Sequence, residues 1–140
     1  HRVGDTTGAI HLLRGWLDDH PEDLVARERL AEFYSRSGRG DEAEREYREI
    51  VNLQPNHASA LNNLAWHLLD EDPESALEYA ERALLSANGS SAIYDTLAMA
   101  QLRNDKLREA RRSIGRAREL DPDNPLLQSH EDEIMAAGSD

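Results

Sequence analysis

The 140-residue chain has 28 Asp and Glu against 16 Lys and Arg, which gives a formal net charge of −12. Binding to nucleic acid generally needs Lys and Arg to neutralise phosphates, so this charge argues against a nucleic-acid-binding protein. The absence of cysteine excludes disulfides and thiolate metal sites. No apolar run reaches the ~20 residues of a membrane span. The composition fits a periplasmic or a cytoplasmic protein equally well.

Residues 3–23 have the pattern of half a helical hairpin. Gly4-Asp5 predicts a turn, and a helix is expected from about Thr7 to Asp19. No helix precedes this one to form a hairpin with it. The chain is therefore expected to be cut from a longer array, and the alternative is that another segment supplies the missing helix.

The apolar residues of this first helix lead to two expectations. Trp16 is predicted to pack in the core, because later segments carry Ile or Ala at the matching position. Ile10, Leu13 and Leu17 are expected to be exposed, because no hairpin partner covers them. Exposed apolar patches tend to find partners, so a weak homodimer through this N-terminal edge is expected, favoured by salt.

Three longer segments follow, and each predicts a helix, a short turn and a second helix. Residues 24–57 and 91–124 have 34 residues each, and residues 58–90 have one fewer. Alanine recurs in register, at positions Ala31, Ala65 and Ala98 of the first helices and Ala9, Ala43, Ala76 and Ala110 of the second helices. A larger side chain at a close helix contact would overpack, at a cost of roughly 1–3 kcal/mol. The spacing therefore indicates a repeat architecture.

Several helix ends are marked by capping residues. Asp41 and Asp72 are predicted N-caps, the second with Pro73 in the first turn of its helix. Asn88-Gly89 is expected to end the helix before it, because both residues tolerate the left-handed conformation.

Residues 125–137 predict a final helix with Asn124 as its N-cap. Glu131-Asp132 stands where the other segments carry Leu-Ala. A polar face at this position is typical of the capping helix that ends a repeat array.

These segments resemble the tetratricopeptide repeat, a helical hairpin with a period of about 34 residues. In residues 91–124 the resemblance rests on Leu97-Ala98, Ala110, Ile114, Ala117 and Asp121-Pro122. The family implies an all-α, right-handed superhelical solenoid of antiparallel helix hairpins. It divides the chain into a half repeat (3–23), three repeats (24–57, 58–90 and 91–124) and a capping helix (125–137). The run Leu-Asn-Asn-Leu-Ala-Trp at 61–66 is also similar to bacterial repeat arrays of envelope and exopolysaccharide systems.

The family resemblance also implies a function, since tetratricopeptide arrays bind a peptide or partner protein in the groove that their first helices line. The residues that it places in this groove are Glu28, Glu32, Asn62, Asn63, Trp66, Leu69, Asp95, Met99 and Leu102. Trp66 is interpreted as an aromatic anchor beside Met99, and the alternative is a Trp that packs between neighbouring repeats. The acids, amides and apolar residues together predict a peptide of apolar and basic character.

The family's best-known binding pattern is absent from this groove. Some members hold a peptide C-terminus in a two-carboxylate clamp of Lys, Asn and Arg. Here Glu28 stands where the first clamp Lys would be, and Glu32 stands where an Asn would be. The resemblance therefore does not imply capture of an acidic tail.

A locally basic helix is expected in the last repeat, with Lys106, Arg108, Arg111, Arg112, Arg116 and Arg118. These residues indicate either a solvated outer face or a docking stripe for an acidic partner.

No catalytic motif is present. The six histidines form no H-E-x-x-H pattern, and no phosphate-binding loop or glycine fingerprint occurs. The histidines are expected in solvated or capping roles, His20 and His57 in loops and His11 and His130 on helix surfaces. The sequence thus predicts no enzymatic activity, no cofactor and no metal. It favours a scaffold or assembly adaptor, and leaves as alternatives a regulatory or assembly segment of a larger enzyme and a self-associating scaffold without a peptide ligand.

Overall fold

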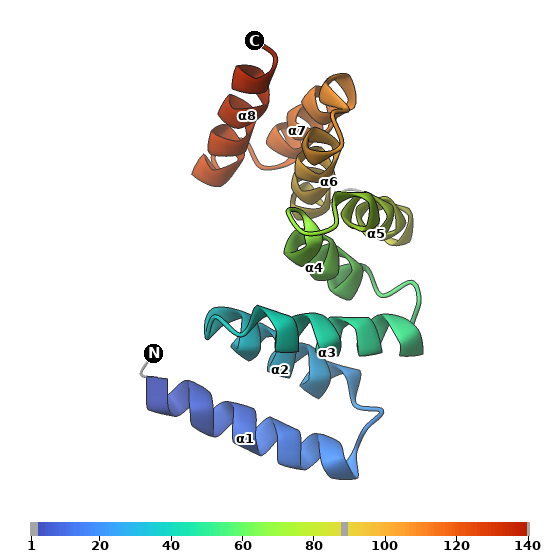
Figure 1. Ribbon diagram of the computed structural model, residues 1–140, viewed down its shortest axis with the longest axis vertical. Helices are drawn as coiled ribbons and strands as arrows, with labels where there is room; N and C mark the ends of the chain where they lie inside the picture. Colours follow the sequence, from blue (N-terminus) through green and yellow to red (C-terminus); the bar gives the residue numbers. More distant parts are fainter. Residues whose placement is uncertain (1–2, 88–89, 140) are drawn as a thin grey trace. The chain divides into compact units, whose positions relative to one another are not determined.

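A computed structural model describes residues 3–87 and 90–139 of the chain, so that Asn88 and Gly89, predicted to end a helix, lie outside the described residues. Within those two ranges the chain forms eight α-helices and no strand, which confirms the predicted all-α class. The helices are α1 (Val3–Asp19), α2 (Leu24–Arg36), α3 (Gly40–Leu53), α4 (Ala58–Leu68), α5 (Pro73–Ser86), α6 (Ser91–Arg103), α7 (Leu107–Leu120) and α8 (Pro125–Ala137) (Figure 1). Across the described ranges, these helices lack the combination of length and hydrophobicity that a membrane span requires.

The chain divides into two compact units, His1–Ala60 and Leu61–Asp140. In the first unit α2 packs against both α1 and α3. In the second unit α6 packs against α5, α7 and α8, and α7 also packs against α8. Contacts between helices that are close in sequence are typical of repeat proteins. The boundaries of the individual repeats stay a prediction.

Each unit has a core made from one face of each helix. In the first unit Leu30 of α2 and Ile50 of α3 are at most 2% exposed. In the second unit Leu64 of α4, Ile114 of α7 and Ile134 of α8 are fully buried. On α3 the buried residues recur every three or four positions, as one face of a helix requires.

The alanine positions read from the sequence behave as predicted at six of seven sites. The fully buried ones are Ala31, Ala43, Ala65, Ala76, Ala98 and Ala110. Ala9 is only partly buried. A side chain no larger than a methyl group is therefore enclosed on all sides at these six positions, which explains their recurrence.

The helix starts are predicted correctly at two of the three proposed N-caps. The Asp72 Oδ1 atom accepts a hydrogen bond from the Ser75 N–H at 3.3 Å. The Asn124 Oδ1 atom accepts one from the Leu126 N–H at 3.0 Å. Asp41 is not an N-cap, because α3 already begins at Gly40, so this carboxylate lies in the first turn. An acidic side chain is favoured there as well, since it faces the positive end of the helix dipole.

The predicted turn at Gly4-Asp5 is wrong. Both residues are helical, because α1 begins at Val3. Asp5 lies in the first turn of α1, where a carboxylate stabilises a helix. An acidic residue near a helix start is thus compatible with a turn and with the helix itself, and the sequence alone does not separate the two.

Candidate functional site

The side chain of Trp66 projects from α4 on the face opposite to the core. Leu61, Leu64 and Leu68 follow the i, i+3, i+7 spacing of a helical face and are at most 3% exposed. Trp66 lies about 140° from the first of them by helix geometry, and it is 42% exposed. A partner can therefore reach this ring.

Asn62 projects from the same side of α4 as Trp66. Its Oδ1 atom is buried and accepts no hydrogen bond within the residues that the structure describes. Buried polar atoms in folded proteins are nearly always paired, so such an acceptor calls for a donor from elsewhere.

A histidine on α8 lies next to the Trp66 ring. The ring centroids of Trp66 and His130 are 5.6 Å apart, with the planes tilted by 43°. The His130 Nδ1 atom is 2.6 Å from the Asp95 Oδ1 atom on α6, which makes a strong hydrogen bond between an imidazole and a carboxylate. Burial raises the pKa of Asp95, while the hydrogen bond from His130 acts in the opposite direction. This pair links α8 to α6 next to the exposed tryptophan.

Polar contacts at the end of α6 hold the surrounding elements in place. The Arg103 Nε group donates to Asp70 at 2.9 Å, and its Nη1 group donates to Glu133 of α8 at 3.3 Å. The Asn104 amide donates to the Pro73 carbonyl at 2.8 Å, at the start of α5. The loop after α4 and the helices α5, α6 and α8 are thus tied together within the second unit.

Two of the predicted groove residues, Met99 and Asp95, are buried. Met99 is 2% exposed, and the ring that Trp66 contacts is that of His130. Asp95 is 6% exposed and bonded to His130, so it does not offer an open carboxylate. Leu69 is also buried, whereas Asn63 and Leu102 are partly exposed. Contact of these residues with a partner stays a prediction.

In the first unit, Glu28 and Glu32 form an acidic face on α2. The Glu28 Oε2 atom is buried and has no hydrogen-bond partner among the described residues. Burial, followed by the charges of Glu32 and Glu28, raises the pKa of Tyr47 on α3 to about 12. The two carboxylates therefore lie close enough to Tyr47 to disfavour its negative form.

The raised pKa of Tyr47 predicts a loss of stability at alkaline pH. The pKa of an unfolded tyrosine is about 10, and burial raises the pKa of Tyr47 in the folded protein to about 12. Between these values the unfolded chain has lost a proton that the folded chain keeps, so stability is complete below the lower value and falls as pH rises. We expect the melting temperature to fall more steeply for wild type than for Tyr47→Phe from about pH 10 to about pH 12. Parallel curves in thermal scans would contradict the raised pKa of Tyr47.

The predicted core position of Trp16 is wrong. This ring is 47% exposed, and it stacks on His20 with centroids 3.7 Å apart. Its Nε1 group donates to the Asp23 Oδ2 atom at 2.8 Å, while Asp23 Oδ1 caps α2 by accepting from the Ala26 N–H at 3.0 Å. The indole thus finds its stacking partner and its hydrogen-bond acceptor locally, near the end of α1, and it stays outside the core.

The exposed edge of α1 also differs from the prediction. Ile10 and Leu17 are buried at 5% and 7% exposure, because α1 packs against α2, and Leu13 is partly buried. The large apolar side chains that α1 exposes in the described residues are Leu12 and Trp16. Self-association through this helix stays a prediction, and these two residues would carry it.

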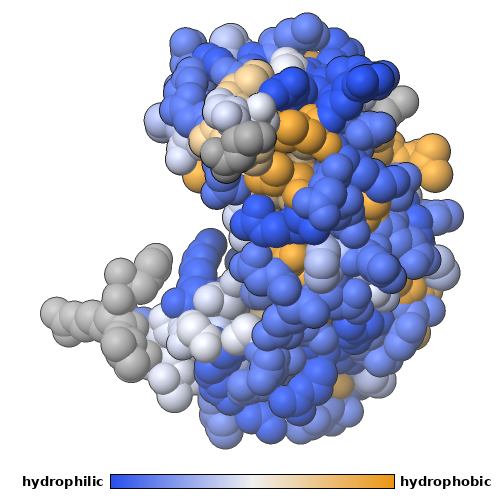
Figure 2. Space-filling view, turned by 45° about the horizontal axis from the view of Figure 1, so that its top comes forward, coloured by the Kyte–Doolittle hydropathy of each residue, from blue (hydrophilic) through white to orange (hydrophobic). Residues whose placement is uncertain are grey.

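Most of the face that Figure 2 shows is hydrophilic, and the hydrophobic side chains on it gather mainly in the upper half of the view. In the described ranges, the large apolar side chains that are at least 40% exposed are Leu12, Trp16, Val25, Leu53, Trp66, Leu85, Leu120, Leu126 and Met135. Of the predicted partner-binding residues, Trp66 is the one in this group. No cluster of three or more His, Asp or Glu side chains in the described ranges has an arrangement that could hold a metal ion.

Comparison with known proteins identifies the fold. Residues 2–65 match the family model described as tetratricopeptide repeat. MamA from Desulfovibrio magneticus RS-1 is similar with a TM-score of 0.86 and 20% sequence identity, over 98% of this chain and 78% of that chain. A search of curated proteins finds no match.

Two further solved structures illustrate the settings in which this fold occurs. The first repeat domain of Spaghetti (RPAP3), bound to the HSP90 peptide SRMEEVD, has a TM-score of 0.76 and 20% identity, over 85% of this chain and 95% of that chain. The O-GlcNAc transferase of Thermobaculum terrenum has a TM-score of 0.76 and 20% identity, over 80% of this chain and 22% of that chain.

Proposed function

From the premise that this chain is built of tetratricopeptide repeats, we propose that it is an interaction scaffold or assembly adaptor. In this proposal each unit offers its own contact surface to a peptide or partner protein, α2 in the first unit and α4 in the second. The ligand has apolar and basic character. No catalytic role is proposed for these residues.

The observation that carries this proposal is a pair of buried side-chain oxygens that accept no hydrogen bond from any described residue. They are Glu28 Oε2 on α2 and Asn62 Oδ1 on α4, each within its own unit. An unpaired buried acceptor costs about 1–3 kcal/mol, so a ligand that brings N–H groups recovers that energy. A Lys or Arg side chain suits the glutamate, and a peptide N–H suits the amide.

Trp66 supplies the apolar part of the proposed contact. Aromatic residues are enriched among those that contribute most to binding, because they bury a large area with little loss of conformational entropy. The exposed ring lies beside Asn62 and Asn63 on α4, so apolar contact and hydrogen bonding to a peptide backbone are available on one helix face. Glu32 is exposed on α2 and adds negative charge there.

The second candidate is a regulatory or assembly segment of a larger enzyme. The similarity to an O-GlcNAc transferase supports this second candidate, because the matched part makes up only 22% of that longer chain. In both candidates the present residues bind a protein, and they differ in whether a catalytic domain belongs to the same chain.

Selection from a phage-displayed library of random peptides tests the proposed ligand character. We expect wild-type protein to enrich peptides that combine Lys or Arg with large apolar residues. The same library on Glu28→Gln/Glu32→Gln protein should lose the preference for basic residues and keep the preference for apolar ones, because the substitution removes charge and little volume. Equal enrichment of basic peptides on both proteins would contradict the role of these two acids.

A further inference from the structure

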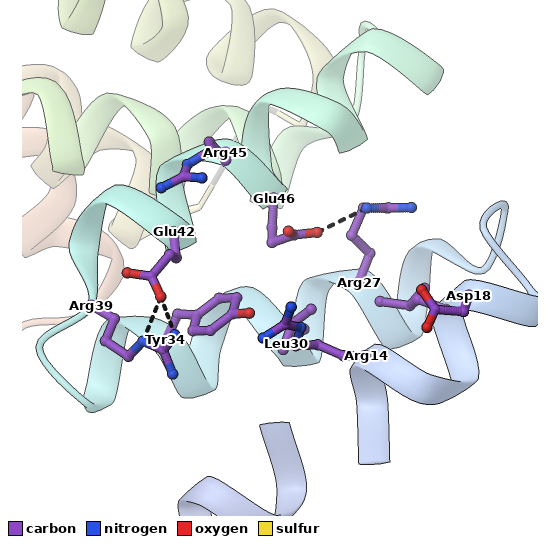
Figure 3. Close-up of a pocket in the computed structure, with 10 residues that line it drawn as sticks. Arg14, Asp18, Arg27, Leu30, Tyr34, Arg39, Glu42, Arg45 and Glu46 are labelled. Carbon is purple, nitrogen blue, oxygen red and sulfur yellow. Dashed lines mark hydrogen bonds and ion pairs between the residues drawn. The ribbon is translucent and has the colours of Figure 1, made fainter. Parts of the chain in front are cut away.

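We propose that the first unit has a second ligand site, which binds a carboxylate-bearing segment of a partner protein. The site is a cavity of about 430 Å³ lined by residues of α1, α2 and α3 and of the turn before α3. Figure 3 shows Arg39 with Glu42 at one end and Arg27 with Glu46 at the other, with Tyr34 and Leu30 between them. Of the residues that line this cavity, the sequence singled out Leu17, as part of the edge expected to self-associate.

The cavity is positively charged in a strongly acidic protein. Four arginines and three acids line it, which leaves one net positive charge, whereas the whole chain has a net charge of −12. Each helix contributes residues at i, i+3 or i+4 spacing, such as Arg14 and Asp18 on α1 and Glu42 and Arg45 on α3. Three helix faces thus bring guanidinium groups around one space.

Two of the four arginines are already paired. The Arg27 Nη1 group donates to Glu46 at 2.8 Å, and its Nη2 group donates to the Pro21 carbonyl at 2.8 Å. Arg39 is paired with Glu42, and its guanidinium lies 4.7 Å from the centre of the Tyr34 ring. These contacts fix the two groups and neutralise much of their charge.

The remaining guanidinium donors have no partner among the described residues. Arg14 and Arg45 are exposed, and neither forms an ion pair with another described residue. The Arg27 Nε group is buried and has no acceptor in the described part of the chain. A buried guanidinium N–H without a partner is uncommon, and an incoming oxygen atom would satisfy it.

A carboxylate fits this arrangement best. The planar fork of arginine binds a carboxylate through two parallel hydrogen bonds. A single negative charge balances the net charge of the cavity. Leu30 and Tyr34, at 2% and 5% exposure, form an apolar floor that suits the carbon atoms of the same segment. The occupant is therefore an Asp- or Glu-containing peptide segment with an adjacent apolar residue.

This site is separate from the faces proposed to bind a basic peptide. Arg27, Leu30 and Tyr34 share one face of α2, while Glu28 and Glu32 lie on the other side of that helix by its ~100° rotation per residue. The two sites select ligands of opposite charge. An experiment that contradicts one proposal therefore does not contradict the other.

Titration with a blocked peptide, Gly-Glu-Leu-Glu-Gly, tests the proposal, with the arginine Nε–H signals observed by NMR. We expect saturable shifts of the Arg14, Arg27 and Arg45 signals, and none with the same peptide carrying Gln for Glu. Arg14→Gln/Arg45→Gln should weaken binding by roughly tenfold, as loss of hydrogen bonds to a charged group implies. Both side chains are exposed and form no ion pair with another described residue, so the fold should be retained, which circular dichroism checks.

The matched control is Arg108→Gln/Arg112→Gln, which removes two exposed arginines from α7 and should leave the affinity unchanged. Several results would overturn the proposal: no saturable shift, equal binding of the Gln peptide, or a loss of affinity in the α7 variant that matches the loss in the cavity variant. Inorganic phosphate is titrated separately. Saturation by phosphate without saturation by the Glu peptide would also overturn it, because the cavity would then bind small anions only.

Discussion

Replacing Asp95 with alanine is expected to destabilise the second unit by about 1.5–3 kcal/mol, the usual contribution of a hydrogen bond to a charged group. The substitution removes the acceptor that lies 2.6 Å from His130. Only 12% of the His130 side chain is exposed, so water replaces the lost partner poorly. The contact between α6 and α8 should weaken in consequence.

Asp95→Asn is the matched control, because it keeps an oxygen at the same place. Urea unfolding should show a clearly smaller loss of unfolding free energy for Asp95→Asn than for Asp95→Ala. Amide hydrogen exchange locates the effect along the chain. The exchange rate in Asp95→Ala protein should rise more in α8 than in α7. Equal losses for the two variants, or unchanged exchange in α8, would show that the pair does not hold the last helix.

The helices and their buried faces follow from the sequence. Periodic apolar residues place Leu64, Ile114 and Ile134 in the core, and recurring alanines mark sites where no larger side chain fits. Local chemistry also determines the caps at Asp72 and Asn124. These features depend on residues within one or two helical turns, which is the range that periodicity describes.

The Asp95–His130 pair was missed because its members are 35 residues apart. A signal for one half was present, since His130 falls three residues after Leu127 and four before Ile134, both of which are buried. A polar residue within an apolar stripe needs a buried partner. Asp95 has no comparable signal, and its burial results from α6 packing against α5, α7 and α8.

Trp16 shows a different limit. A large aromatic residue on an apolar face predicts the core, yet His20 lies one turn later and Asp23 follows it. Residues four apart on a helix contact each other, so a stacked pair competes with burial. The charged cavity is harder to foresee, because each helix shows an ordinary polar face and only their convergence creates the site.

Trp66→Ala is expected to weaken partner binding by roughly thirtyfold, which corresponds to the ~2 kcal/mol or more that an aromatic anchor contributes. The ring is 42% exposed and lies outside the buried face of α4, so its loss should change the fold little. Trp16→Ala is the matched control, because that ring is exposed to a similar degree, at 47%, on α1. It should leave the affinity unchanged.

The dissociation constant of Trp66→Ala protein for a peptide selected by wild type, measured by calorimetry alongside the melting temperature, tests the central claim most directly. The proposed scaffold function predicts a roughly thirtyfold weaker complex at an unchanged melting temperature and helical content. An unchanged dissociation constant would contradict the claim that this face binds the partner. A melting temperature that falls together with the affinity would show instead that Trp66 is a structural residue.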